Sequence, residues 1–153
     1  MLTKIISGGQ TGADQGGLEG GRRCGIATGG VAPLGYRTEK GKEADLLKGY
    51  GLVEHPSEDY KPRTRMNAVM SHGTVWFGKV GSPGYKSTLK ACEQFNRPFI
   101  DNPGPVTLAL WVGLHHISIL NVAGNRESKN PGLYEKVVKI IVETFGVPYH
   151  TNS

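Results

Sequence analysis

The segment KIISGGQTGADQGGLEGG near the N-terminus passes from an apolar run into glycines and one short polar stretch. Gly8 and Gly9 can adopt positive φ and, because they lack Cβ, they allow a ligand to approach the backbone closely. Gln10 and Thr11 add an amide and a hydroxyl group, and a helix is expected to start at Gly12. A strand, a glycine turn and a helix N-terminus often form an anion site, since free N–H groups and the helix dipole point at the ligand. A tight turn without a ligand is the alternative.

A second glycine loop lies in GSPGYKSTLKA, residues 81–91, where another helix is expected to begin. Gly84, Ser87 and Thr88 lie near its first turn and could cradle a phosphate or another oxyanion. Ordinary helix capping by Ser82 or Ser87 explains the same residues equally well, so both interpretations stay open.

A third polar cluster, LNVAGNRES at residues 120–128, comes at the end of an apolar run. Asn121, Gly124 and Arg126 are its candidate ligand contacts, because a guanidinium group can make two parallel hydrogen bonds to an oxyanion. A surface ion pair between Arg126 and Glu127 is the alternative. The position of Arg126, beside a glycine and after a strand, favours the ligand.

Several familiar site types do not fit the chain. The dinucleotide fingerprint requires a glycine where Gln10 stands, and a P-loop ending at Lys86-Ser87 requires glycines at Tyr85 and Val80. The five histidines have no spacing typical of a metal site, and no nucleophile lies in a pattern with a general base. Nicotinamide binding, P-loop ATPase activity and a metal centre are therefore disfavoured, and we assign no catalytic residue.

Alternating strands and helices must position these loops. Apolar runs predict strands at residues 4–7, 73–77, 98–101 and 117–122, with a weak signal at 25–28. Apolar spacing predicts helices at residues 12–23, 85–96, 106–115 and 133–145. The alternation indicates one α/β domain over residues 1–153, a Rossmann-like open sheet that is mainly parallel, with helices on both faces. In such folds ligands bind at the carboxyl ends of the strands, where the three polar loops fall.

Residues 30–62 lack any apolar rhythm and are rich in turn formers, so we expect a long functional loop there. Its Tyr36, Arg37, Tyr50 and Tyr60 are expected to lie over the site.

Composition restricts the partner. The net charge of +5 fits a small anionic ligand, and the basic residues form no stripe with aromatics that would indicate nucleic acid. No apolar run approaches the ~20 residues of a membrane span, and the apolar run that follows Met1-Leu2-Thr3-Lys4 leaves no room for a signal peptide. Cys24 and Cys92 indicate neither a disulfide framework nor a zinc site. We expect a cytoplasmic protein without a membrane or nucleic-acid partner.

The helix expected at residues 106–115, VTLALWVGLH, is apolar nearly all round. Such a helix fits burial by the sheet on one side and by a partner on the other. We therefore expect a homo-oligomer.

Four motifs together resemble a known family. GGQTGAD, TGGVAPLGYRTEKG at 28–41, DYKPRTRMN at 59–67 and LNVAGNRES follow one another as in the molybdenum cofactor carrier proteins, also described as circularly permuted relatives of the YpsA-like proteins. These belong to a superfamily with the LOG-like, or lysine-decarboxylase-like, nucleotide-binding folds. The resemblance implies a Rossmann-like fold, assembly into a dimer or tetramer, and binding of molybdenum cofactor or a related phosphorylated ligand, a nucleotide among them. Molybdoenzymes would be the acceptors.

The resemblance also implies ligand contacts at the positions that match its motifs. These are Gly8, Gly9, Gln10, Thr11, Gly12 and Asp14, then Arg37, Glu39, Arg63 and Asn67, and finally Asn121, Gly124 and Arg126. We expect a phosphate or an oxo-metal group to lie against the bare backbone of Gly9. Asp14 could read a ring N–H of the ligand or only complement the dipole of its helix.

One departure bears on activity. In the LOG-like hydrolases a glutamate follows three residues after the threonine of a PGGxGTxxE motif, and Ala91 stands at that position when Thr88 is aligned. The resemblance therefore favours a binding protein over an enzyme. A LOG-like nucleoside-monophosphate phosphoribohydrolase and a nucleotide-sensing module are the alternatives.

Overall fold

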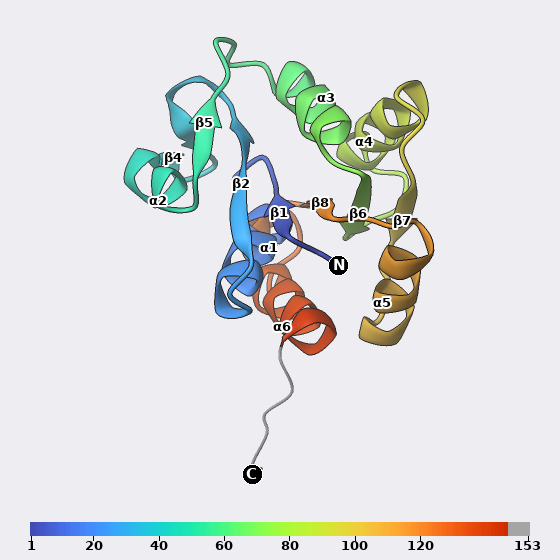
Figure 1. Cartoon of the computed structure of the whole chain (residues 1–153). Helices are drawn as coiled ribbons and strands as arrows, with labels where there is room; N and C mark the ends of the chain where they lie inside the picture. Colours follow the sequence, from blue (N-terminus) through green and yellow to red (C-terminus); the bar gives the residue numbers. More distant parts are fainter. Residues whose placement is uncertain (147–153) are drawn as a thin grey trace.

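The computed structural model describes residues 1–146 and is built on one six-stranded sheet (Figure 1). Its strands are β1 (Lys4–Ile6), β2 (Ala27–Ala32), β5 (Leu52–Glu54), β6 (Gly73–Phe77), β7 (Phe99–Asp101) and β8 (Ile119–Gly124). They lie in the order β5-β2-β1-β8-β6-β7, and every neighbouring pair is parallel. The predicted α/β class with a parallel sheet is confirmed.

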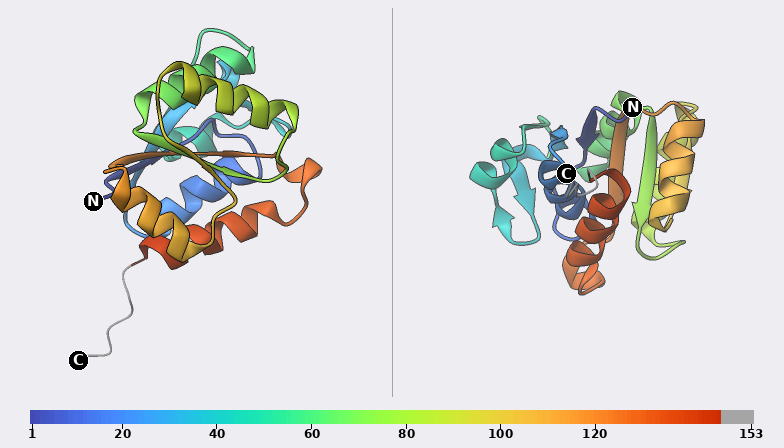
Figure 2. Two further views of the ribbon diagram at one scale, coloured as in Figure 1. Left: turned by 90° about the vertical axis from the view of Figure 1, so that its right-hand side faces the viewer. Right: turned by 60° about the horizontal axis from the view of Figure 1, so that its bottom comes forward.

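Helices cover both faces of the sheet, as predicted. The long ones are α1 (Ala13–Arg23), α3 (Tyr60–Met70), α4 (Pro83–Gln94), α5 (Pro105–Leu114) and α6 (Leu133–Phe145). In the left view of Figure 2, α3 and α4 lie above the sheet, and α1, α5 and α6 lie below it. The short helix α2 (Ala44–Gly49) packs beside β5 at one edge. The layers are those of a Rossmann-like fold.

The order of the strands creates a switch point in the middle of the sheet. From β1 the chain goes to β2 and β5 on one half, and then crosses through α3 to β6 and β7 on the other. It returns through α5 to β8, which lies between β1 and β6. At such a point the loops at the carboxyl ends of neighbouring strands diverge and leave a crevice.

The main core lies between the sheet and the helices below it. Ile5, Val75 and Leu120 of three adjacent strands are fully buried, and Val137 and Ile141 of α6 pack into the same cluster. The bounds of α6 match its predicted range, because its apolar stripe has clear helical spacing. Burial of this stripe fixes α6 under the sheet.

Glycines in α1 allow unusually close packing, although glycine disfavours helices. A Cβ at Gly17 would lie 2.6 Å from Cβ of Val122, and one at Gly20 would lie 2.7 Å from Cβ of Ile141. The glycines in the second half of the opening motif are therefore needed for contact of α1 with β8 and α6. They do not face a ligand.

The predicted long loop over residues 30–62 is wrong. The segment contains the end of β2, a 3₁₀ turn at Leu34–Tyr36, the small hairpin of β3 (Arg37–Thr38) and β4 (Gly41–Lys42), α2, β5 and the start of α3. The end of β2 escaped notice because glycines interrupt its apolar pattern. Gly30 has a φ of +125°, and a Cβ there would lie 2.1 Å from the carbonyl oxygen of Ser7, so only glycine fits. Helix α3 was not predicted because only its Asn67 and Ala68 are buried, so it has no apolar stripe with helical spacing.

Strand β8 also differs from its predicted range of 117–122. It begins at Ile119 and ends at Gly124, two residues later than predicted at each end, so Gly124 lies within the strand and not in the loop after it, and Asn121 lies in the middle of the strand. The small residues at 123 and 124 hid this extension, because a Cβ at Gly124 would lie 2.0 Å from the carbonyl oxygen of Phe77 on the neighbouring strand.

Helix α5 exposes an apolar stripe. Val106, Leu110 and Leu114 lie one turn apart and are 70–75% exposed, whereas Leu108 and Val112 face the core. The helix carries no charged residue. Among the described residues no helix is long and apolar enough to cross a membrane.

The close contact of α1 generates a stability prediction. Gly17→Ala should lower the free energy of unfolding by about 1–3 kcal/mol, because overpacking against Val122 outweighs the gain in helix propensity. Urea denaturation followed by circular dichroism measures the change. The control is Gly49→Ala at the end of α2, where a Cβ meets no atom within 4 Å, and it should be neutral or slightly stabilising. Equal effects of the two substitutions would contradict this account of α1.

Candidate functional site

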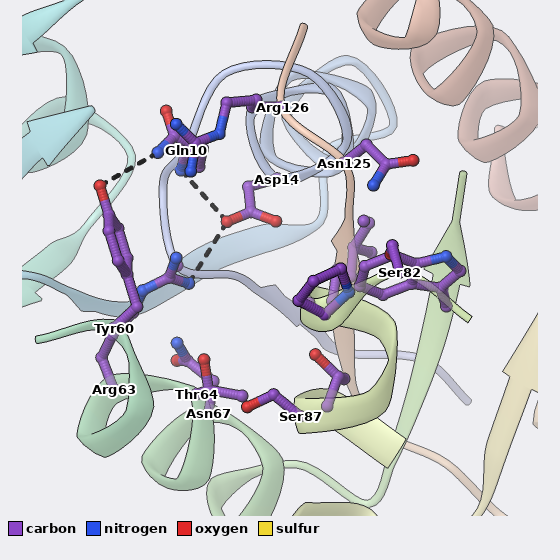
Figure 3. Close-up of a pocket in the computed structure, with 18 of the residues that line it drawn as sticks. Gln10, Asp14, Tyr60, Arg63, Thr64, Asn67, Ser82, Ser87, Asn125 and Arg126 are labelled. Carbon is purple, nitrogen blue, oxygen red and sulfur yellow. Dashed lines mark hydrogen bonds and ion pairs between the residues drawn. The ribbon is translucent and has the colours of Figure 1, made fainter. Parts of the chain in front are cut away.

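A cavity of about 680 Å³ lies at the switch point, over the carboxyl ends of β1, β6 and β8 (Figure 3). Its wall comes from the loop after β1, the first turns of α3 and α4, and the segments that follow β6 and β8. The parallel sheet thus brings together three loops that are far apart in the sequence. This is the position expected for a ligand site.

The loop after β1 folds around the side chain of Asp14. Oδ2 of Asp14 accepts a hydrogen bond from the backbone N–H of Gln10 at 3.1 Å. Asp14 is 4% exposed and sits in the first turn of α1. The glycine turn is therefore shaped around a carboxylate of its own chain.

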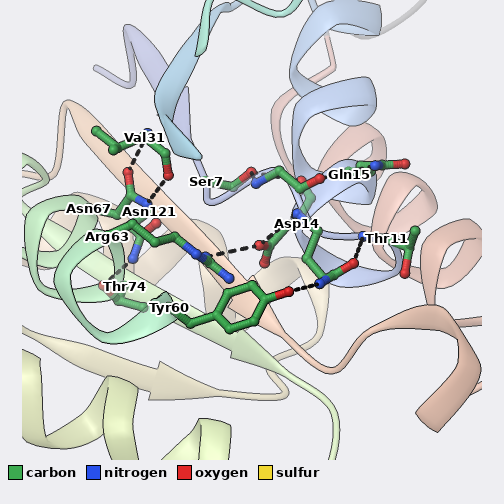
Figure 4. Close-up of polar contacts among 12 residues, drawn as sticks. Ser7, Thr11, Asp14, Gln15, Val31, Tyr60, Arg63, Asn67, Thr74 and Asn121 are labelled. Atoms are coloured by element: carbon green, nitrogen blue, oxygen red, sulfur yellow. Dashed lines mark hydrogen bonds and ion pairs between the residues drawn. The ribbon is translucent and has the colours of Figure 1, made fainter. Parts of the chain in front are cut away.

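Arg63 of α3 reaches the same carboxylate across the cavity (Figure 4). Its Nη1 lies 3.5 Å from Oδ2 of Asp14, and its guanidinium group lies 5.0 Å from the ring centroid of Tyr60. The Tyr60 hydroxyl group in turn contacts the side-chain amide of Gln10 at 3.4 Å. A Cβ on Gly8 would collide with Arg63, so the glycine is required for this approach.

Burial raises the pKa of Asp14 from 3.8 to about 6, and Arg63 and the loop N–H groups oppose part of this rise. Asp14 is therefore mainly ionised at neutral pH and titrates near it. A buried carboxyl group with a shifted pKa in a cavity is typical of functional sites.

Two buried asparagines line the floor of the cavity but already have partners. The side chain of Asn67 makes a pair of hydrogen bonds, 2.9 and 3.0 Å, with the backbone of Val31 in β2. The amide of Asn121 donates to the hydroxyl group of Thr74 at 3.1 Å. Asn67 thus ties α3 to the sheet, and Asn121 ties β8 to β6.

The wall opposite Asp14 begins with α4 and the loop before it. Ser82 caps α4 by accepting from the Tyr85 N–H at 3.3 Å, as one sequence interpretation held. Oδ1 of Asn125 accepts from the Lys79 N–H at 2.6 Å and so joins the loops after β6 and β8.

Arg126 makes no ion pair with Glu127. The Glu127 carboxylate instead accepts from the backbone N–H groups of Gly132 and Tyr134, at 2.7 and 2.9 Å, and so caps α6. Among the described residues no ion pair holds the Arg126 side chain, which lines the cavity. This guanidinium group is available to a ligand.

The charges on the wall are mostly positive. The basic side chains are Lys61, Arg63, Lys79, Arg126 and Lys129, and the acidic ones are Asp14 and Asp59. Of these five cations only Arg63 has a carboxylate partner among the described residues. The cavity therefore attracts anions.

Two buried donors in the wall lack a partner within the described chain. They are Nε1 of Trp76, whose side chain is almost completely buried, and Nε of Arg63. An unpaired buried N–H group is costly, and both donors belong to residues that line the cavity.

The structure brings most of the candidate residues together in this wall. They are Gly8, Gln10, Asp14, Arg63, Asn67, Gly84, Ser87, Thr88, Asn121, Gly124 and Arg126. Gly9, Thr11, Gly12, Arg37 and Glu39 do not line it.

Gly9 faces away from the position where we expected a phosphate. A Cβ there would lie 2.8 Å from Leu47 and 2.9 Å from Leu52. Both leucines belong to a second core cluster, formed by Leu18, Ala32, Tyr36, Leu47, Tyr50 and Leu52. Gly12 likewise packs against the backbone of residues 125–127. Both residues have positive φ, so their glycines are required by backbone conformation and close packing.

The other three candidates outside the wall lie in or beside the β3–β4 hairpin. Glu39 accepts hydrogen bonds from the hydroxyl groups of Thr11 and Ser128, and thereby connects the hairpin to the loops after β1 and β8. These bonds lower the pKa of Glu39 although burial raises it. Arg37 is exposed, and its Nε lies 3.5 Å from Oε1 of Glu58.

Of the tyrosines expected over the site, only Tyr60 is there. Tyr36 and Tyr50 are buried in the second core cluster, and the Tyr50 hydroxyl group donates to Glu19 at 2.7 Å. Several further wall residues were not predicted as site residues, among them Asp59, Lys61, Thr64, Trp76, Lys79 and Lys129. One sequence signal could have located the start of α3, because an aspartate three residues before a proline is compatible with a helix start. In the structure Asp59 caps α3 by accepting from the Lys61 N–H at 3.2 Å.

Comparison with known proteins identifies the family. The model of the circularly permuted YpsA SLOG family matches residues 5–145, and the chain belongs to this family. A crystal structure from Syntrophus aciditrophicus, described as a "Putative molybdenum carrier protein", is similar over 94% of each chain, with 34% identity and a TM-score of 0.83. No curated protein matches the chain.

The shifted pKa of Asp14 has a consequence for stability. In the unfolded chain the group titrates near 3.8, so between that pH and about 6 the folded state binds more protons than the unfolded state. The contribution of Asp14 to stability therefore falls as the pH rises through this window. The fall is about 3 kcal/mol, because a shift of one pKa unit corresponds to about 1.4 kcal/mol. Asp14→Asn should remove this fall.

Urea denaturation of the wild type and Asp14→Asn across this pH window measures the effect as the difference between the two proteins. Asp59→Asn is the control, because it removes an exposed carboxylate and keeps a residue that can cap α3. A pH dependence that Asp14→Asn leaves unchanged would show that the Asp14 pKa is not raised by burial.

Proposed function

We propose that this protein binds and carries a phosphorylated heterocyclic ligand, with molybdenum cofactor as the first candidate. The observation that supports it most is the basic wall of the cavity, in which cations without carboxylate partners stand beside buried N–H donors without acceptors. The name of the similar crystal structure points to the same ligand class.

The residues present fit the anionic parts of such a ligand. Lys79, Arg126 and Lys129 line the cavity on the segments after β6 and β8, and the second turn of α4 adds Ser87 and Thr88. Guanidinium and ammonium groups bind phosphate and oxo groups through charge-assisted hydrogen bonds. The Tyr60 ring, partly exposed beside Arg63, offers a flat surface for a heterocycle.

The two carboxylates of the wall fit a carrier better than a hydrolase, because both are bonded within the chain. Asp59 accepts from a backbone N–H as a helix cap, and Asp14 accepts from Gln10 and Arg63. Ala91, the position compared with the hydrolase glutamate, is buried beside Ala68 and Cys92 in the packing of α3 against α4. Molybdoenzymes are the acceptors that we propose, in the cytoplasm, where thiols such as Cys24 and Cys92 stay free.

The ligand can be identified by native mass spectrometry and metal analysis of protein purified from a cell that makes molybdenum cofactor. We expect a bound pterin phosphate, with or without molybdenum. Release of free base from nucleoside monophosphates by the purified protein would instead support the phosphoribohydrolase alternative.

Arg126 provides a test of the anion contact. Arg126→Ala should weaken binding of molybdenum cofactor by about 1.5–3 kcal/mol, the range for hydrogen bonds to charged groups. The thermal stability of the ligand-free protein should hardly change, because no ion pair within the described chain holds this side chain. Arg65→Ala on α3, outside the cavity wall, is the matched control. Unchanged affinity in Arg126→Ala would rule out this contact.

We also propose that the protein is a homo-oligomer that uses the apolar stripe of α5. The stripe is centred on Leu110, with Val106 one turn before it and Leu114 one turn after it. Two antiparallel copies of such a stripe complement each other about a two-fold axis, since Val106 of one copy faces Leu114 of the other.

Light scattering at micromolar concentration should report a multiple of the 16.5 kDa chain mass. Leu110→Glu should shift the protein to the monomer, because a carboxylate in an apolar interface loses its hydration. Val80→Glu, at an exposed valine in the loop after β6, serves as the control. A wild type that is already a monomer would contradict the proposal.

A further inference from the structure

The glycine loop after β1 has the form of an anion cradle, yet its N–H groups are already occupied. That of Gln10 bonds the Asp14 carboxyl group, and the Gly9 N–H donates to Oγ of Ser7 at 3.2 Å. The Thr11 N–H lies 3.0 Å from Oε1 of Gln10. The donors that would hold a phosphate thus have acceptors within the chain.

Arg63, the cation nearest to this loop, is also engaged. Its guanidinium group lies against Gly8 and faces Oδ2 of Asp14 at 3.5 Å, a long distance for an ion pair. The charge of the Asp14 carboxylate opposes that of Arg63, so this end of the cavity does not favour a second anion. The cations that lack a carboxylate, Lys79, Arg126 and Lys129, belong to the segments after β6 and β8.

We propose that Asp14 determines specificity: its carboxylate occupies the anion cradle of the first loop and makes this end of the cavity a receptor for hydrogen-bond donors. The phosphate of the ligand then binds on the side of α4 and Arg126, and Asp14 accepts from ring N–H and amino groups of the heterocycle. The proposal rests on the proposed function and specifies which end of the ligand lies where.

The chemistry of an ionised carboxylate narrows the ligand class. Its two oxygens together accept about four hydrogen bonds and donate none, so besides the contacts of Oδ2 with Gln10 and Arg63 it can accept from a heterocycle that presents a ring N–H next to an exocyclic amino group. The 2-amino-4-oxo-pyrimidine ring shared by pterins and guanine has this edge. A ring with an oxo group in place of the amino group would set an acceptor against the carboxylate and leave its own edge unpaired.

Inorganic phosphate is the probe for the first half of the proposal. Asp14→Ala should bind it roughly 10–100-fold more tightly than the wild type, because the cradle N–H groups and Arg63 lose their internal anion. Adding Arg63→Met to this variant should abolish the gain. Asp59→Asn removes the same charge from the same wall without freeing the cradle, and should change phosphate affinity only a few-fold.

Isothermal calorimetry, with circular dichroism to verify folding, measures these affinities. If Asp14→Ala does not fold, Asp14→Asn replaces it, since it removes the charge and keeps the shape. If the wild type binds phosphate as tightly as the Asp14 variant does, the inference that Asp14 occupies the cradle is wrong. The outcome does not depend on the native ligand, so it is distinct from the co-purification experiment that decides the proposed function.

Pterin and lumazine probe the second half, because lumazine carries an oxo group where pterin has its 2-amino group. Fluorescence titration of the wild type should show at least tenfold tighter binding of pterin, and Asp14→Ala should reduce this preference to near unity. Equal affinities of the wild type for the two compounds would overturn the assignment of Asp14 to the donor edge.

Discussion

The carboxylate of Asp14 is the group around which the candidate site is organised. It gathers the N–H groups of the loop after β1, opposes the positive charge of Arg63 from α3, and sits in the first turn of α1. These three parts come from different layers of the fold: α1 lies below the sheet, α3 lies above it, and the loop after β1 lies at its edge. A buried ion pair contributes little net stability because both groups lose hydration, but it strongly disfavours arrangements in which either group is left alone. The pair therefore specifies geometry more than it stabilises the chain.

The fold and the general location of the site could be predicted from sequence because they depend on patterns of local origin. Apolar runs and helical stripes located β1, β6, β7 and α6, and the rule for parallel sheets then placed the polar loops at one edge. The prediction for the segment from β2 to α3 was wrong for a physical reason. In β2 the close approach of Ser7 excludes a side chain at Gly30, and the Gly29-Gly30 pair separates Thr28 from Val31, so the β-branched residues of the strand do not form a continuous run. In α3 the buried face is small and polar, since Asn67 is used to bond the backbone of Val31.

Individual roles in the site were harder to predict, since they depend on which way a backbone turns. Gly8 and Gly9 are neighbours in sequence, but one meets Arg63 in the cavity and the other meets Leu47 in the core. Lys79 and Trp76 lie in no motif, and the pairing of β6 with β8 brings them into the same cavity wall as Arg126. The interpretation of Glu127 as a partner of Arg126 failed because the free N–H groups at the start of α6 attract its carboxylate.

The contacts of Glu39 bear on how a ligand could leave. Its carboxylate is bonded to Thr11 and Ser128 at once, so the β3–β4 hairpin clasps the loops after β1 and β8 from outside the cavity. Because one carboxylate holds both loops, loss of the Glu39 contacts would free the two loops from the hairpin at the same time. In the carrier that we propose, a protein that binds the hairpin and displaces Glu39 would therefore act on both loops of the site without entering the cavity.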